Sequence, residues 1–285
     1  MRIPSQAQRT KPAAEDFIAI TMTDRKHALM CEQMLLSMQR TWSELPTVRL
    51  LVDDRHGSVN TKRLQRSYGG LIQLVDWAHI IEHHKNRQRL ELIEFAEGNL
   101  LGRKLAFILS EADQQKTLWI DNDILFFQDF LPLVQAQPDG VFVGATRDST
   151  FGGSEKLASY APGLARHLFQ GDASVPSVNS GLTLASGCIY DAFQLAPLVK
   201  HTLDTREHSY FTEQTVIAWA ALRSRKIIWD MQVVRLDDTD IYQLGPSPTD
   251  HSWRARHYTG NIRHLFWRDA FFLRFRGRNK ISHAG

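Results

Sequence analysis

The stretch Trp119-Ile120-Asp121-Asn122-Asp123-Ile124-Leu125-Phe126-Phe127 places two carboxylates one residue apart, directly after an apolar strand. Like charges at this range raise the pKa of one carboxyl group unless a cation neutralises them. Mg²⁺ and Mn²⁺ bind carboxylate oxygens and keep coordination positions open for phosphate oxygens. The stretch therefore predicts a divalent-metal site, with a solvated strand-to-turn boundary as the alternative.

Apolar runs alternate with amphipathic segments on both sides of this stretch. Residues 17–22 and 48–52 are apolar, and the segment 26–40 between them has methionines and a leucine at helical spacing. This order predicts a parallel strand pair in an α/β sheet, with ligands bound at the carboxyl ends of the strands. Further strands are expected at 71–75, 117–120, 141–143, 182–184 and 226–229, and further helices at 80–95, 101–112 and 212–222.

The net charge of +3 is distributed unevenly along the 285 residues. Residues 251–285 hold eight Lys or Arg side chains and one acid, Asp269, so their net charge is +7, whereas residues 1–250 carry −4. This distribution excludes a uniformly basic nucleic-acid-binding protein. The C-terminal segment also lacks a nucleic-acid recognition motif, so no nucleic-acid partner is expected.

Composition and length predict a folded cytoplasmic protein. Two cysteines are too few for a disulfide framework, which favours a reducing compartment. The N-terminal segment lacks the apolar core of a signal peptide, and no run reaches the ~20 apolar residues of a membrane span. The expected organisation is a flexible tail at 1–16, one domain at 17–262, and a basic, aromatic extension at 263–285.

The segment 104–130 resembles the central part of glycosyltransferases with the GT-A fold. In that family a Lys or Arg on a helix precedes a strand that ends in Asp-x-Asp, as Lys104, Asp121 and Asp123 do here. The sequence is most similar to the retaining family that includes glycogenin and the bacterial lipopolysaccharide galactosyl- and glucosyltransferases.

Three later segments resemble the same family, in the expected order. Residues 178–182 are similar to its Asn-(Ser/Ala)-Gly-Val segment beside the donor sugar, and residues 211–217 to its Asp-Gln pair at the start of a helix. Residues 257–260 are similar to the His-x-x-Gly that closes the metal site. Four ordered matches cover most of the chain.

The resemblance implies a single α/β domain with a Rossmann-like, mostly parallel central sheet flanked by helices. It also implies a hexosyltransferase that takes a nucleotide-diphosphate sugar, with UDP as the expected nucleotide, and retains the anomeric configuration. The acceptor would be a hydroxyl on a glycan or a lipid-linked saccharide. Mn²⁺ or Mg²⁺ would be bound by Asp121, Asp123 and His257.

The remaining site residues are carried over position by position. The residues that would contact the donor are Thr21, Thr23, Asp24, Lys104, Asp121, Asn122, Asn179, Ser180, Gly181, Gly260 and Arg263. The residues that would lie beside the anomeric carbon and act in catalysis are Asn179, Glu213 and Gln214.

The sequence departs from the family at two places. Lys26 and His27 stand where the family has an aromatic residue that stacks on the base, so the base is left open. Arg263 replaces the usual Lys, and residues 263–267 replace the family's Lys-Pro-Trp. A planar guanidinium can still bind phosphate oxygens through two hydrogen bonds.

Two other functions are compatible with the Asp-x-Asp pattern. A phosphatase of the haloacid dehalogenase type would use Asp121 as its nucleophile, although that class usually has its motif on the first strand. A non-catalytic protein that binds nucleotide sugars is the second alternative, and the intact carboxylates argue against it.

The C-terminal segment suggests a membrane contact. Between residues 261 and 278 an apolar helical face adjoins Phe271 and Phe272, with arginines interspersed. Such a segment can lie in an anionic membrane interface, which would make the protein peripheral to the membrane. The alternative is a last helix that packs on the domain with a basic outer face.

Overall fold

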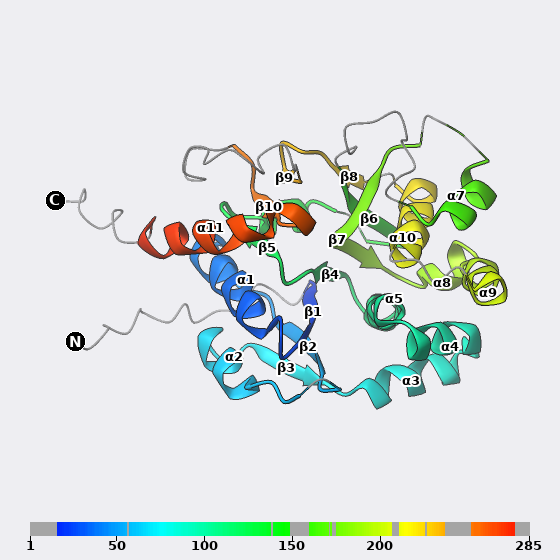
Figure 1. Ribbon diagram of the computed structural model, residues 1–285, viewed down its shortest axis with the longest axis horizontal. Coiled ribbons are helices and arrows are strands. Elements are labelled where there is room, and N and C mark those ends of the chain that lie inside the picture. Colours follow the sequence, from blue (N-terminus) through cyan, green and yellow to red (C-terminus); the bar gives the residue numbers. More distant parts are fainter. Residues whose placement is uncertain are drawn as a thin grey trace.

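The computed structural model describes residues 16–55, 57–137, 139–148, 160–170, 172, 175–206, 211–225, 227–236 and 252–276. Its centre is a seven-stranded sheet in the order β3-β2-β1-β4-β7-β6-β8 (Figure 1). β7 runs antiparallel to both of its neighbours, and the other neighbouring strands pair in parallel. The predicted single-domain α/β architecture is therefore confirmed. The strands are β1 (Ile18–Asp24), β2 (Val48–Asp53), β3 (Ile72–Val75), β4 (Thr117–Ile120), β6 (Phe142–Arg147), β7 (Val178–Ser186) and β8 (Ile227–Trp229).

Helices cover both faces of this sheet (Figure 1). β1, α1 and β2 form the predicted parallel unit, and Asp24 pairs in register with Asp53. The carboxyl ends of β1 and β2 thus finish at the same level, where side chains from both strands can meet a ligand. The helices are α1 (Ala28–Thr41), α2 (Thr61–Ser67), α3 (Trp77–Asn86), α4 (Leu90–Gly98), α5 (Leu100–Ala112), α6 (Leu131–Gln135), α7 (Pro162–Phe169), α8 (Ile189–Ala192), α9 (Ala196–Thr205) and α10 (Thr212–Arg223).

The helical region expected at 80–95 is divided into α3 and α4. Gln88, between them, has a φ of 57°, and this left-handed backbone interrupts the helix. The next residue, Arg89, is buried, and its guanidinium lies 2.6 Å from the carboxylate of Asp113. The break turns Arg89 inward to this ion pair, which the helical periodicity alone does not reveal.

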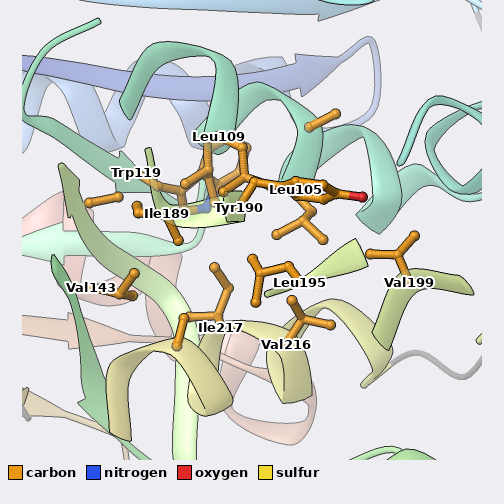
Figure 2. Close-up of a cluster of buried hydrophobic side chains, with 14 of the residues drawn as sticks. Leu105, Leu109, Trp119, Val143, Ile189, Tyr190, Leu195, Val199, Val216 and Ile217 are labelled. Carbon is orange, nitrogen blue, oxygen red and sulfur yellow. The ribbon is translucent and has the colours of Figure 1, made fainter. Parts of the chain in front are cut away.

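Apolar side chains pack against both faces of the sheet. Ile18 and Ile20 belong to one core cluster and Phe17 and Ala19 to another, because successive side chains of a strand point to opposite faces. The first cluster surrounds Trp119 of β4. Figure 2 shows its indole near Leu105 and Leu109 of α5, with Val216 and Ile217 of α10 across the cluster.

A smaller sheet and the last helix complete the fold. The smaller sheet has the order β5-β10-β9, with β5 (Ile124–Phe126), β9 (Val234–Arg235) and β10 (Ala255–His257). A 3-10 turn (Gly260–Ile262) leads into α11 (Arg263–Arg276), which lies alongside α1 (Figure 1). Leu265, Phe266, Ala270 and Leu273 of α11 are buried in a third apolar cluster that also includes residues of β5 and α1.

Buried polar contacts also hold α11 in place. Asp269 is fully buried and accepts a hydrogen bond of 2.7 Å from the Tyr258 hydroxyl. Arg256 lies 3.6 Å from the same carboxylate. Among the described residues, no helix combines the length and the apolar character that crossing a bilayer requires.

Candidate active site

A tight turn between β4 and β5 brings the two aspartates together. The Asp121 amide donates a hydrogen bond of 2.8 Å to the Gly181 carbonyl of β7. The Ile124 amide closes the turn with a hydrogen bond of 3.2 Å to the Asp121 carbonyl. His257 of β10 pairs with Ile124 in the antiparallel ladder, which brings its side chain to the turn. The sequence separates Asp123 and His257 by 134 positions, and the sheet pairing closes that separation.

Asp121, Asp123 and His257 form a group of side chains, the metal group, that could hold a metal ion. One ligand atom from each lies within 4.8 Å of the other two. His257 Nε2 is 3.0 Å from Asp123 Oδ1 and 3.8 Å from Asp121 Oδ2. Asp123 and His257 are buried, so their carboxylate and imidazole are fixed by packing. Two carboxylates and one imidazole nitrogen are donors that fit a divalent ion such as Mn²⁺.

The charges of this group depend on one another. Burial alone would raise the pKa of Asp123, but contacts with His257 and Arg263 lower it to about 2. Burial acts to lower the pKa of His257, and the two aspartates outweigh it and raise that pKa. Asp123 therefore keeps its negative charge beside His257 and Arg263.

Gly181 makes room for the His257 ring. A Cβ atom on residue 181 would lie 2.2 Å from His257 Cε1, far inside van der Waals contact. The sequence predicted that Gly181 contacts the donor. The structure adds a close contact with His257, a candidate metal ligand.

Lys104 links the metal group to Glu213. Its buried ammonium lies 3.2 Å from Asp121 Oδ1, 3.5 Å from Glu213 Oε1 and 3.2 Å from Ser180 Oγ. The Ser180 hydroxyl donates to Glu213 Oε2 at 3.0 Å. Burial raises the pKa of Glu213 to about 7, and nearby Lys104 limits the rise. Glu213 can therefore exchange a proton near neutral pH.

The polar side chains of β7 and α10 form a connected wall beside this pair. Asn179 Oδ1 accepts a hydrogen bond from the Gly181 amide at 2.8 Å. Gln214 Oε1 accepts from the Ser180 amide at 3.4 Å, and its Nε2 donates to Asp148 Oδ2 at 3.5 Å. Asp148 was not predicted from the sequence. Its position directly after β6 is the signal that could have identified it.

At the end of β1 the predicted donor contacts partly bind one another. The Thr21 hydroxyl lies 2.7 Å from the Ile120 carbonyl and 3.1 Å from Asn122 Oδ1, and Asn122 Nδ2 donates to the Met22 carbonyl at 2.9 Å and to Thr23 Oγ at 3.2 Å. The Asn122 amide thus joins the ends of β1 and β4.

Three further predicted residues are Asp24 at the end of β1, Gly260 in the 3-10 turn after β10, and Arg263 at the start of α11. Asp24 Oδ1 accepts from the His27 amide at 2.8 Å. Arg263 Nη2 donates to Asp123 Oδ2 at 2.7 Å, and its predicted contact with phosphate stays a prediction. Gly260 has a φ of 47°, a left-handed backbone that glycine adopts readily, and apart from its chain neighbours no described residue has an atom within 4 Å of its Cβ position.

Comparisons with known proteins place this geometry in a recognised fold. No family model matches the sequence, and no curated protein matches it. Solved structures do match. Mouse xyloside xylosyltransferase 1 superimposes with a TM-score of 0.54 at 14% identity, over 87% of this chain and 99% of that one. The galactosyltransferase LgtC superimposes with a TM-score of 0.56 at 15% identity, over 91% of this chain and 99% of that one.

A third match is the bifunctional glycosyltransferase WbbM, with a TM-score of 0.56 at 11% identity. It covers 91% of this chain and 50% of that one. The protein has the GT-A glycosyltransferase fold. At these identities the likeness establishes the fold alone. Within the GT-A fold, the candidate site lies at the carboxyl ends of β1, β4 and β6, the edge where ligands bind in open α/β sheets.

Gly181→Ala is expected to push the His257 imidazole out of the metal group. Loss of one oriented ligand should weaken Mn²⁺ binding at least about tenfold, which titration calorimetry would measure. Gly98→Ala is the matched control, because beyond its own helix backbone and chain neighbours no described residue has an atom within 4 Å of a Cβ built there. Equal Mn²⁺ affinity in the two variants would contradict the role assigned to Gly181.

The raised pKa of Glu213 predicts a pH-dependent stability. The ordinary pKa of 4.5 applies to the unfolded chain, and the folded value is about 7. The unfolded state therefore releases this proton first, so the stability linked to Glu213 is fully present below pH 4.5 and is lost as pH rises through 7.

Glu213→Gln should abolish this loss. Relative to the variant, the free energy of unfolding of the unsubstituted protein should fall by about 3 kcal/mol between pH 4.5 and 8, measured by urea denaturation without metal. The same substitution at exposed Glu94 serves as the control. A constant difference between Glu213→Gln and the unsubstituted protein across this range would show that Glu213 ionises normally.

Proposed function

We propose that this protein is a metal-dependent glycosyltransferase that moves a hexose from a nucleotide-diphosphate sugar, UDP-hexose first, to a hydroxyl of a glycan or lipid-linked saccharide. One observation carries the proposal: Asp121, Asp123 and His257 converge at the ligand-binding edge of a GT-A fold, beside the buried Lys104–Glu213 pair. The LgtC structure contains donor and acceptor sugar analogues, which supports the same substrate classes here.

The metal ligands would be Asp121, Asp123 and His257, and the ion would be Mn²⁺ or Mg²⁺. When bound, the ion neutralises the charge that grows on the departing diphosphate. Lys104 adds a buried positive charge beside Asp121. Arg263 is 44% exposed and can turn from Asp123 to phosphate oxygens, since its planar fork fits carboxylate and phosphate alike.

The sugar and the acceptor would lie against the wall formed by Asn179, Glu213 and Gln214. These side chains offer amide and carboxyl groups that hydrogen-bond sugar hydroxyls. We propose retention of the anomeric configuration, with a diphosphate oxygen taking the proton from the acceptor hydroxyl. The edge residues Thr21, Thr23 and Asp24 would contact the nucleoside, without the stacking aromatic that the family has.

The phosphatase alternative is not favoured by the fold, because the superimposed structures are glycosyltransferases. It makes a separate prediction that is easily checked. A phosphatase would release phosphate from a generic aryl phosphate, whereas a glycosyltransferase would not.

Mn²⁺ and UDP together are expected to raise the melting temperature of the protein more than either alone, because ligands that bind only the folded state stabilise it by mass action. Asp123→Asn should abolish this joint stabilisation and the transfer of hexose. Asp54→Asn, at an exposed aspartate after β2, is the control. A fully active Asp123→Asn enzyme would remove the metal assignment.

We further propose that the outer face of α11 contacts an anionic membrane surface at the cytoplasmic side. The apolar side chains predicted on one face of this helix pack on the domain instead, so the membrane would meet the opposite face. That face exposes Trp267, Phe271 and Phe272 by 46%, 56% and 40%, next to arginines. Exposed aromatic rings with arginines between them suit the headgroup region.

Replacing both Phe271 and Phe272 with serine should weaken binding to phosphatidylglycerol vesicles at least about tenfold, because two aromatic rings would no longer be buried in the membrane interface. A sedimentation assay would measure the bound fraction. Leu90→Ser, at a leucine that is 63% exposed on α4, controls for general loss of apolar surface. Unchanged vesicle binding in the double variant would rule out this contact.

A further inference from the structure

The indole of Trp119 contacts Asp121, the first aspartate of the metal group. Trp119 and Asp121 are two positions apart at the end of β4, so their side chains point to the same side of the sheet. Trp119 Nε1 donates a hydrogen bond of 2.6 Å to Asp121 Oδ1. This donor comes from the apolar core, since Trp119 is only 2% exposed.

Packing fixes the position of this indole. Phe107 of α5 meets its ring edge to face, with centroids 6.3 Å apart. The Lys104 ammonium lies 5.1 Å from the ring centroid, within range of a cation–π contact. Figure 2 shows the ring within the buried cluster between the sheet and α5. The N–H is therefore held in one direction, toward Asp121.

The two oxygens of the Asp121 carboxylate have different surroundings. Lys104 Nζ lies between them, 3.2 Å from Oδ1 and 3.5 Å from Oδ2. The Trp119 N–H binds Oδ1. Oδ2 faces the other candidate ligands, 3.8 Å from His257 Nε2. The indole thus holds Oδ1, and Oδ2 is the oxygen directed toward His257.

We propose that Trp119 is a positioning residue for the metal: its N–H holds Asp121 Oδ1, so that the carboxylate presents a single oxygen, Oδ2, to the ion. This inference rests on the proposed metal-dependent function. A carboxylate fixed in this way binds an ion without first losing rotational freedom, which is how groups beyond the direct ligands tune metal affinity.

A second tryptophan shows that this hydrogen bond is not a general demand of the core. Trp42 is also fully buried, and its Nε1 has no hydrogen-bond partner among the described residues. The fold therefore tolerates a buried indole with an unpaired N–H. The hydrogen bond from Trp119 to Asp121 is therefore better explained by the positioning of the Asp121 carboxylate than by a requirement to pair the indole N–H.

The test compares Trp119→Phe with Trp42→Phe, because both remove a buried indole and only the first removes a hydrogen bond to Asp121. Titration calorimetry with Mn²⁺, in the presence of UDP, should show dissociation constants about 10- to 100-fold higher for Trp119→Phe than for Trp42→Phe. Indole fluorescence provides a second measurement. Mn²⁺ should change the emission of the Trp42→Phe protein and leave that of Trp119→Phe nearly unchanged.

Should Trp119→Phe fail to fold, benzothienylalanine at position 119 keeps the shape of the indole and replaces its N–H with sulfur. The same loss of Mn²⁺ affinity is expected. The role of Trp119 would be overturned if this variant, or folded Trp119→Phe, bound Mn²⁺ as tightly as Trp42→Phe does. The proposed metal site would still stand in that case, provided that Asp123→Asn abolishes Mn²⁺ binding. An unsubstituted protein that binds no Mn²⁺ with UDP would overturn both proposals.

Discussion

The structure depends on the neutralisation of two carboxylates that the turn after β4 holds close together. Asp121 and Asp123 cannot both stay ionised in a partly buried site unless positive charge surrounds them. The fold supplies this charge from three distant elements: Lys104 on α5, His257 on β10 and Arg263 at the start of α11. A divalent ion would take over part of this role and release Arg263 for phosphate. The arrangement of the helices and of the second sheet around β4 is what brings these cations within reach.

Much of this could be predicted from the sequence, because the signals were local. The apolar runs at 17–22 and 48–52 predicted β1 and β2, and the Asp-x-Asp stretch predicted where β4 ends. The resemblance of residues 257–260 to the family's His-x-x-Gly implied a third candidate ligand, and the pairing of β10 with β5 brings His257 to the aspartates. Short motifs of this kind carry their chemistry in a few adjacent residues.

The features that were missed depend on contacts between distant residues. The break between α3 and α4 turns Arg89 toward Asp113, and Asp148 meets Gln214 only because β6 and α10 pack on each other. The hydrogen bond of Trp119 to Asp121 joins residues only two positions apart on the chain. Its direction, however, is fixed by the contacts of the indole with Phe107 and Lys104 of α5. Hydrophobic pattern alone assigned Trp119 to the core and gave no sign of a polar role.

The antiparallel pairing of β10 with β5 also sets the order in which the site can form during synthesis. The ribosome completes β4, β5 and both aspartates long before it reaches His257, 134 positions after Asp123. Until β10 is added, the nascent chain carries two paired carboxylates without their imidazole and without Arg263. Contacts of such wide sequence separation form late and slowly. The candidate metal site is thus complete only once β10 and α11 are in place, and an ion bound there with full affinity would report that the C-terminal segment has docked.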